Sequence, residues 1–576
     1  MKVRLKPDPT DDRGRLQAGA KHKPFARLHR ARIAGGVRLQ ADLQADLQAD
    51  LQADLQSDLD SGRKSFYNGA RRRSDMRRWH VIVTAVLAVV AVCAVTTVAQ
   101  QRTAESRDMT LLGSNDLQAR SAYQPVIQKQ GNRYIAYVGH HAGSMPNTLT
   151  GKLEDNGTSV IDVTNPRQPK YIAHIPGGGE AQGPGQAQMV RTCAGADLPK
   201  ADKSKFYLLR ALGTSGHELW DVTTPEKPTR ITQIIGGLKD THKSWWECET
   251  GIAYLVGGDP AWRTARMTKI YDLSDPTHPV FIRDFGLPGQ QPGSTVNPVP
   301  TELHGPISIV KANRVYFGYG TGRYGVVQIV DRKKLLEGPK EPTDANLRYP
   351  VIGQLDLPID VGAHTTFPML HMVLPEYGKQ NWQQVITNTA AGTHAAAEGF
   401  APPTNQGMRD FIVTVGETTA NECLEARQLV RIVDATFEKN MIPVSSWTVP
   451  ETSGNFCSRG GRFGTHSTNE NMTPIYYGRV IFVAYFNAGI RALDVRDPFN
   501  PKEIAYYIPP VTAKTDKRCV GRGADERCKI AIQTNNVEVD DRGYIYIVDR
   551  ANTGMHILEL AGAARRVANF PTNATN

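Results

Sequence analysis

The chain has 576 residues, of which 40% are hydrophobic, together with 52 glycines and 36 prolines. It is too long for one ordinary core, and its short apolar runs, separated by turn residues, favour an all-β body of many short strands. The formal net charge is +11, but most of the excess lies in residues 1–99, and the rest of the chain is close to neutral. A basic groove for DNA or RNA is therefore not indicated.

Residues 1–75 form a segment of low complexity. The motif Leu-Gln-Ala-Asp repeats almost without change between Leu39 and Leu59, and this period of four would spread apolar positions around a helix instead of holding one face. The flanks are rich in arginine and contain almost no aromatic residues. We expect residues 1–75 to be disordered, or to precede the true start of translation.

Residues 76–99 are typical of a secretory signal peptide. Met76 is followed by two arginines and then by an apolar run that ends at Ala99, directly before Gln100. A basic segment, an apolar segment and a small residue at the cleavage position predict export to the periplasm, the cell surface or the medium. The alternative is that residues 81–99 remain as a membrane anchor, because their length approaches that needed to cross a bilayer.

Six cysteines follow Ala99, and an even number in an exported chain predicts disulfides. Six cysteines allow about fifteen pairings. Order along the chain favours three of them: Cys193 with Cys248, Cys423 with Cys457, and Cys519 with Cys528. The sequence contains no Cys-x-x-Cys motif, so it supports neither a zinc ribbon nor a redox dithiol.

One repeat unit recurs along the chain, a short apolar strand that ends in Asp. In the complete copies, such as Val160-Ile-Asp-Val-Thr-Asn-Pro166, a turn with two prolines follows. The aspartate can accept hydrogen bonds from the turn, and the prolines prevent its continuation as a helix. The aspartates that end these strands are Asp162, Asp221, Asp272, Asp331, Asp434 and Asp494.

The spacing of these units predicts propeller blades. An apolar strand precedes each aspartate-ended strand, and successive aspartates are 59, 51, 59, 103 and 60 residues apart, as four-stranded blades require. The long interval predicts an insertion near residues 370–408. A seventh unit, in residues 544–560, lacks its last strand, and residues shortly after Ala99 are placed to supply it and close the ring.

We therefore predict an all-β, seven-bladed β-propeller over residues 121–562. Residues 100–120 are expected to form a linker and the ring-closing strand, and residues 563–576 a C-terminal tail.

The repeats resemble the LVIVD repeat of extracellular propeller proteins. The likeness is carried by Val160-Ile-Asp-Val-Thr-Asn-Pro166 and Gln328-Ile-Val-Asp331, and it covers residues from about 120 to 560. It implies the propeller architecture but no particular activity, since that family is largely defined by its repeat. The seven units with axial histidines are also similar in organisation, without a shared diagnostic motif, to the selenium-binding and methanethiol oxidase propellers.

Four units open with a histidine just before their first strand: His242, His304, His364 and His466. The first strand of every blade lines the propeller axis, so these positions converge there. Imidazole suits copper, iron or zinc, and a histidine ring without thiolates leaves a coordination position open more readily than a closed structural site. The alternative is a structural role, in which the histidines cap strand ends and join neighbouring blades through water.

Other candidates are indicated by position alone. His371 and Glu417 belong to the unit with the insertion, and Asn535 and Glu538 belong to the seventh unit. Trp245 and Trp246 follow His242 closely and are candidates for the wall of a substrate pocket, although large aromatic residues between sheets more often serve packing.

Several motifs of common enzymes do not apply. Gly320-Thr-Gly-Arg-Tyr-Gly325 matches the dinucleotide fingerprint but lies between two predicted strands, with no helix to bind a pyrophosphate, so we predict a turn and no nucleotide cofactor. The sequence has no Gly-x-Ser-x-Gly or His-Glu-x-x-His motif, so a hydrolase would lack its nucleophile or its zinc site.

Two functions from different classes remain. The first is an exported metalloprotein, with the four histidines as ligands of one transition metal, acting as an oxidoreductase on a small molecule. The second is a non-catalytic platform that binds protein or glycan through its blade loops, with structural histidines. Propellers support both, so the fold does not choose between them.

Overall fold

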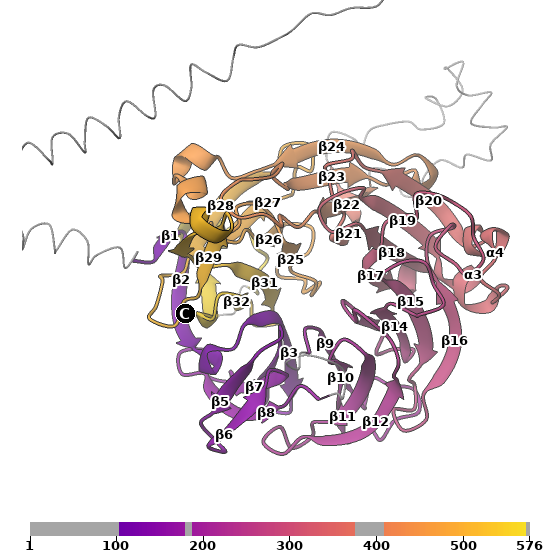
Figure 1. The fold of residues 1–576 in the computed structure, drawn as a ribbon, viewed down its shortest axis with the longest axis horizontal. Coiled ribbons are helices and arrows are strands. Elements are labelled where there is room, and N and C mark those ends of the chain that lie inside the picture. Colours follow the sequence, from indigo (N-terminus) through magenta and orange to yellow (C-terminus); the bar gives the residue numbers. More distant parts are fainter. Residues whose placement is uncertain (1–102, 179–186, 375–407, 572–576) are drawn as a thin grey trace, which may run out of the picture. The chain divides into compact units, whose positions relative to one another are not determined.

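A computed structural model describes residues 103–178, 187–374 and 408–571. These residues form seven antiparallel sheets arranged in a ring around one axis (Figure 1), which confirms the predicted seven-bladed β-propeller. The predictions for residues 1–75 and 76–99 fall outside the described residues. Within those three ranges, no helix is long and apolar enough to cross a membrane.

Blades 1 to 5 are continuous in sequence, and each strand pairs with the next one outward from the axis. Blade 1 contains β3 (Ala122–Gln130), β4 (Arg133–His140), β7 (Thr158–Asp162) and β8 (Lys170–Ile175). Blade 2 contains β9 (Val190–Ala194), β10 (Phe206–Leu212), β11 (Gly216–Asp221) and β12 (Thr229–Ile235). Blade 3 contains β13 (Trp245–Trp246), β14 (Ile252–Gly257), β15 (Met267–Asp272) and β16 (Val280–Phe285).

The next two blades follow the same order. Blade 4 contains β17 (Leu303–Ile309), β18 (Arg314–Tyr319), β19 (Val326–Asp331) and β20 (Val351–Asp356). Blade 5 contains β21 (Thr365–Val373), β22 (Met408–Val415), β23 (Val430–Asp434) and β24 (Ile442–Trp447). The expected insertion near residues 370–408 falls between β21 and β22, largely on residues 375–407, which lie outside the described ranges.

The last two blades take strands from both ends of the described chain. Blade 6 contains β25 (Ser467–Thr468), β26 (Val480–Ala484), β27 (Ile490–Asp494) and β28 (Lys502–Ile508), and β1 (Glu105–Arg107) adds a fifth, outer strand. Blade 7 contains β31 (Thr534–Val539), β32 (Ile545–Asp549) and β33 (Gly554–Leu560), and its outer strand is β2 (Met109–Asn115). The strand that the seventh unit lacks in sequence is thus supplied by residues shortly after Ala99.

Two small hairpins and a few short helices lie outside the blades. The hairpins are β5 (Ser144–Asn147) with β6 (Lys152–Asp155), and β29 (Lys517–Val520) with β30 (Arg527–Ile530). The α-helices of the described residues are α3 (Arg332–Glu337), α4 (Asp344–Arg348) and α7 (Gly562–Arg565). The 3-10 turns are η1 (Leu117–Ala119), η2 (Val310–Ala312), η3 (Glu438–Asn440), η4 (Glu451–Ser453), η5 (Phe456–Arg459) and η6 (Gly523–Asp525).

The aspartates of the repeat end the third strand of each of the first six blades, as predicted. In blade 1 the Oδ1 of Asp162 accepts a hydrogen bond from the backbone N–H of Thr164 at 2.9 Å. Asp221, Asp272, Asp434 and Asp494 accept the same bond two residues on, whereas Asp331 caps α3 through the N–H of Lys334. The carboxylate therefore satisfies a backbone donor where the strand stops and the chain turns.

Apolar side chains between neighbouring blades form the core. Phe482 and Ile490 of blade 6 pack with Ile547 and Leu558 of blade 7, and Met109 of the ring-closing β2 joins this cluster. All five side chains are at most 3% exposed. Ring closure is therefore secured by side-chain packing as well as by the β2–β33 hydrogen bonds.

Three disulfides stabilise connections at the blade edges. They join Cys193 to Cys248, Cys423 to Cys457, and Cys519 to Cys528, which are the three pairs that order along the chain favours. The first links blades 2 and 3, and the third joins directly paired residues of the β29–β30 hairpin. Gly320–Gly325, the dinucleotide-like motif, connects β18 to β19 as the predicted strand-to-strand turn.

Candidate metal centre

Three of the four axial histidines precede the first strand of their blade, His364 and His466 immediately and His242 by three residues, and their backbone is held by the second strand. The N–H groups of His242, His364 and His466 donate to carbonyls of β14, β22 and β26 at 3.0, 2.7 and 2.9 Å. Because the three blades use the same backbone bond, they direct the three side chains to the same level of the axis.

His304 reaches this level through a β-bulge. Leu303 pairs with Tyr319 and Gly305 pairs with Gly318, so His304 is an extra residue in β17. The first strands of blades 1 and 7 have comparable irregularities, at Tyr123 and at Asn535. A bulge turns one side chain away from the regular alternation of a strand. Here it adds Tyr123, His304 and the Asn535 backbone to the histidine layer.

The four histidines, hereafter the histidine cluster, lie in contact in the order His242, His304, His364, His466. Nε2 of His242 lies 2.8 Å from Nε2 of His304, and the ring centroids of successive pairs are 4.4, 3.4 and 4.4 Å apart. His304, His364 and His466 are fully buried, and His242 is 6% exposed. One ring nitrogen from each of His242, His304 and His364 lies within 4.8 Å of the other two.

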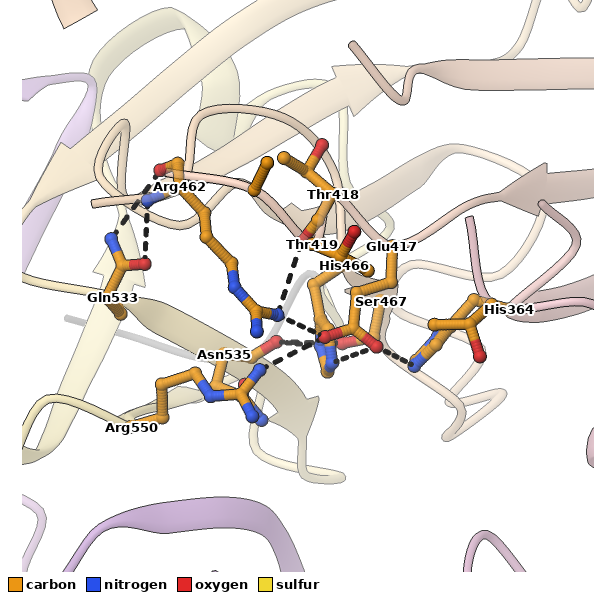
Figure 2. Close-up of polar contacts among 12 residues, drawn as sticks. His364, Glu417, Thr418, Thr419, Arg462, His466, Ser467, Gln533, Asn535 and Arg550 are labelled. Atoms are coloured by element: carbon orange, nitrogen blue, oxygen red, sulfur yellow. Dashed lines mark hydrogen bonds and ion pairs between the residues drawn. The ribbon is translucent and has the colours of Figure 1, made fainter. Parts of the chain in front are cut away.

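Glu417 joins the histidine cluster from the loop after β22. Its Oε2 lies 3.7 Å from Nε2 of His364 and 3.8 Å from Nε2 of His466, and these three groups form a second set of ligand atoms within 4.8 Å of one another. Its Oε1 accepts from Arg462 at 2.5 Å and from Arg550 at 3.1 Å. Figure 2 shows the carboxylate between two guanidinium groups on one side and the two imidazoles on the other.

The hydrogen bonds of the cluster leave several ring nitrogens free. Nδ1 of His466 lies 2.6 Å from the carbonyl oxygen of Asn535, which only accepts, so Nδ1 carries the hydrogen and Nε2 keeps a lone pair. This Nε2, the Nε2 of His364 and the Nδ1 of His304 are buried and have no hydrogen-bond partner. A buried polar atom without a partner costs about 1–3 kcal/mol, so the cluster is poorly satisfied without a ligand.

The imidazoles are neutral at physiological pH. Burial lowers the pKa of His242, His304 and His364 well below 6.5, and the pKa of His466 to about 3 against the opposing effect of Glu417. Burial raises the pKa of Glu417, but His466, Arg550 and Arg462 outweigh it and lower this pKa to about 2. Neutral imidazoles beside an ionised carboxylate are the protonation states that metal ligands require.

Tyr123 of blade 1 occupies the position that histidines occupy in the later blades. Its hydroxyl lies 3.2 Å from Nε2 of His242, and its ring packs edge-on against His466 with centroids 5.7 Å apart. Its backbone carbonyl accepts from the Asn535 side chain at 3.1 Å. Burial and the charge of Glu417 raise the pKa of Tyr123, so the phenol is protonated and available as a hydrogen-bond donor.

A cavity of about 360 Å³ lies beside the histidine cluster. We call it the arginine cavity, and its polar lining includes Ser121, His141, Asn156, Asp516, Arg518 and Arg550. Arg550 donates to Nε2 of His141 at 2.9 Å and, on its other side, to Glu417. The wall of the arginine cavity is therefore separated from His364 and His466 by a single carboxylate.

The remaining predicted residues lie elsewhere. His371 is 61% exposed in its side chain and lies 3.8 Å from Asp410, far along β21 from His364. Glu538 belongs to a second layer, further along the inner strands, where its carboxylate accepts backbone N–H bonds from Glu470 and Asn471. Asn535 contributes its backbone carbonyl, and not its side chain, to His466.

The second layer is an ion-pair network. Glu470 pairs with Lys243 and with Arg191, the latter at 2.5 Å, and accepts from Gln124 at 3.1 Å. Burial raises the pKa of Glu470, but Lys243 and Arg191 lower it to about 2, whereas burial and the charge of Glu470 raise the pKa of Glu538 to about 7.

The two tryptophans have different environments. Trp246 is 5% exposed and packs in the core with Leu255 and Tyr271. Trp245 stacks under the Arg191 guanidinium at 4.8 Å and lines a cavity of about 210 Å³ beside Glu470 and Glu538. Both tryptophans line this cavity, but Trp246 also packs in the core, as large aromatic residues commonly do.

Sequence reasoning missed Tyr123, His141, Arg462 and Arg550. Tyr123 could have been found by aligning blade 1 with the later blades at the position of the axial histidine. The other three lie in connections between strands, where the repeat imposes no pattern.

The comparisons with known proteins show no family. No protein-family model matches the sequence, and no curated protein matches it either. The resemblance of the repeats to the LVIVD family is therefore not confirmed. A similar solved structure is the β-propeller domain of Cps50 (Swd1) from Myceliophteria thermophila, with 8% identity and a TM-score of 0.38 over 76% of this chain and 97% of that one.

Proposed function

We propose that the propeller binds one transition metal ion through His242, His304, His364 and His466, and that it acts as an oxidoreductase on a small molecule. The observation that carries the proposal is the convergence of four buried, neutral imidazoles, three of which have a buried ring nitrogen without a hydrogen-bond partner. A structural role would be expected to pair those nitrogens with protein groups. A metal ion would satisfy them, and Glu417 would supply a fifth donor or hold a bound water.

The ligand set suits copper, iron or zinc, since imidazole binds all three metals. Copper and iron are redox-active, and this is the reason to propose electron-transfer chemistry.

The surrounding residues have definite tasks in this proposal. Arg462 and Arg550 keep Glu417 ionised and oriented, and the Asn535 carbonyl fixes the tautomer of His466. The Tyr123 hydroxyl is placed to donate a hydrogen bond or a proton beside His242. The arginine cavity would hold the substrate. A bound redox metal would supply the electron acceptor or the site of oxygen activation.

Export is part of the proposal. Residues 76–99 have the composition of a signal peptide, and three disulfides are consistent with an oxidising compartment. Cell fractionation followed by N-terminal sequencing of the mature protein tests it, and we expect a mature chain that begins at Gln100. An intact segment 76–99 in a membrane fraction would indicate the anchor instead.

Metal content decides the function. We would purify the protein without chelator, measure copper, iron and zinc by plasma mass spectrometry, and compare the double variant His304→Ala/His466→Ala. The matched control is His371→Ala, which removes an exposed imidazole from a ligand-bearing blade. We expect about one equivalent of metal in the wild type and in the control, and none in the double variant. A folded wild type that holds and accepts no metal would overturn the proposal and leave the protein- or glycan-binding platform as the better function.

A further inference from the structure

Two guanidinium groups, of Arg518 and Arg550, and one carboxylate, of Asp516, line the arginine cavity. Burial, together with the charges of Arg462 and Arg518, lowers the pKa of Arg550 to about 10. The three guanidinium groups therefore lie close to one another. Glu417 serves both Arg462 and Arg550 through the same oxygen. Asp516 is half-exposed and lies 3.7 Å from Arg518, and the charge of Asp549 also acts on Arg518.

Arg518 also keeps a donor that no protein group uses. Nε of Arg518 is buried and has no hydrogen-bond partner, while its Nη2 donates to the Arg550 carbonyl at 2.8 Å. Arg518 and Arg550 both line the cavity, and their side chains are 25% and 18% exposed. An unpaired buried N–H of a guanidinium costs free energy, so protein groups do not fully satisfy the Arg518 side chain.

His141 does not compensate this charge, because it is neutral. Burial and the charge of Arg550 lower its pKa well below 6.5, and its Nε2 accepts a hydrogen bond from Arg550. The lining of the cavity thus combines two cations, Arg518 and Arg550, with one half-exposed anion, Asp516. Two further carboxylates act on these arginines from outside the lining, Glu417 on Arg550 and Asp549 on Arg518.

We infer that the arginine cavity binds a small organic carboxylate, held by the guanidinium groups of Arg518 and Arg550. A planar carboxylate matches the fork of guanidinium donors, and a volume of about 360 Å³ accommodates a compact organic acid. The assignment of this acid as the substrate rests on the proposed function, since Glu417 alone separates Arg550 from His364 and His466. The binding itself does not depend on the metal.

The hairpin β29–β30 holds one half of this site. Arg518 lies on β29, and the neighbouring Cys519 is joined to Cys528 across the hairpin. The disulfide thereby limits the movement of the strand that carries Arg518 over the cavity.

Isothermal titration calorimetry tests the inference on the full-length protein, in chelator-treated and in metal-loaded form. The probes are benzoate and acetate, with sulfate as the inorganic anion. The variants are Arg518→Gln, Arg518→Lys, which keeps the charge but loses the fork, and Arg348→Gln as a control on the exposed surface of α4.

We expect one carboxylate per chain in both forms of the wild type and of the control. Arg518→Gln should weaken binding about tenfold or more, and Arg518→Lys should restore only part of it. The inference is overturned if neither form binds a carboxylate, if Arg518→Gln binds as tightly as the wild type, or if sulfate binds as tightly as benzoate. Carboxylate binding by a protein that holds no metal would overturn the proposed function alone, so the two failures are distinguishable.

Discussion

The variant His364→Leu tests whether the histidine cluster is a ligand-binding site or a structural part of the core. The two roles predict changes of opposite sign in the free energy of unfolding. His364 is fully buried, its Nε2 has no hydrogen-bond partner, and its Nδ1 makes one contact, 3.2 Å from the Thr365 hydroxyl. Removing the orphaned nitrogen should recover about 1–3 kcal/mol, and losing the long hydrogen bond should cost about 0.5–1 kcal/mol. Thr365 keeps a partner, because Lys243 donates to its hydroxyl at 3.0 Å.

We therefore expect the chelator-treated variant to be more stable than the chelator-treated wild type by about 1–2 kcal/mol. The measurement is urea unfolding followed by circular dichroism, with the disulfides intact. Metal added at about 100 times its dissociation constant should then raise the stability of the wild type by about 2.7 kcal/mol and leave the variant almost unchanged. A chelator-treated variant that loses 2 kcal/mol or more would refute the reasoning, because the imidazole would then be a structural member of the core.

Three further predictions concern pH, ring closure and the disulfide hairpin. Burial lowers the pKa of His556 from 6.5 to about 4, so below pH 6.5 the unfolded chain takes up a proton that the folded chain refuses. His556 should thereby contribute a fall in stability of about 1.4 kcal/mol per pH unit, about 3.4 kcal/mol in all by pH 4. In urea titrations at pH 7, 6 and 5, His556→Phe should reduce the total slope by about this amount, while the other buried histidines keep their own contributions; an unchanged slope would contradict the assignment. Met109→Ala should lower the free energy of unfolding by about 2–4 kcal/mol, because Met109 is 3% exposed in the core that closes the ring; a loss below 0.5 kcal/mol would show that closure does not depend on this packing. Replacing Cys519 and Cys528 by Ser should weaken benzoate binding several-fold in calorimetry without changing metal content, and equal affinity would show that Arg518 is held by other contacts.

The blade architecture was predictable because the repeat has a physical cause in each copy. An apolar strand stops where Asp162 or its counterparts accept a bond from the turn, and this local rule survives sequence divergence. The axial histidines were predictable for the same reason, since they occupy one position of the repeat. The strand supplied by residues 109–115 followed from the incomplete seventh unit.

The repeat does not predict how far along the propeller axis a given side chain lies from the histidine layer. Successive residues of a strand advance by about 3.3 Å, so Glu538, three residues after Asn535, lies about 10 Å from the histidine layer, and His371, seven residues after His364, lies further still. Glu417 reaches the layer because it follows β22 at the end nearest His364. Arg462 and Arg550 could not be selected, because connections between strands carry no periodicity that would distinguish them from other surface arginines.

Ring closure also sets the order of events on the ribosome. β2 (Met109–Asn115) is synthesised among the first strands of the propeller, whereas its partner β33 (Gly554–Leu560) comes last. The edge of β2 must therefore wait unpaired while more than four hundred residues are synthesised, and the last interface forms only when translation of the domain is complete. The nascent chain therefore has an unpaired strand edge throughout its synthesis. A ribosome that stalls within blade 7 would release an open, aggregation-prone fragment instead of a smaller closed propeller.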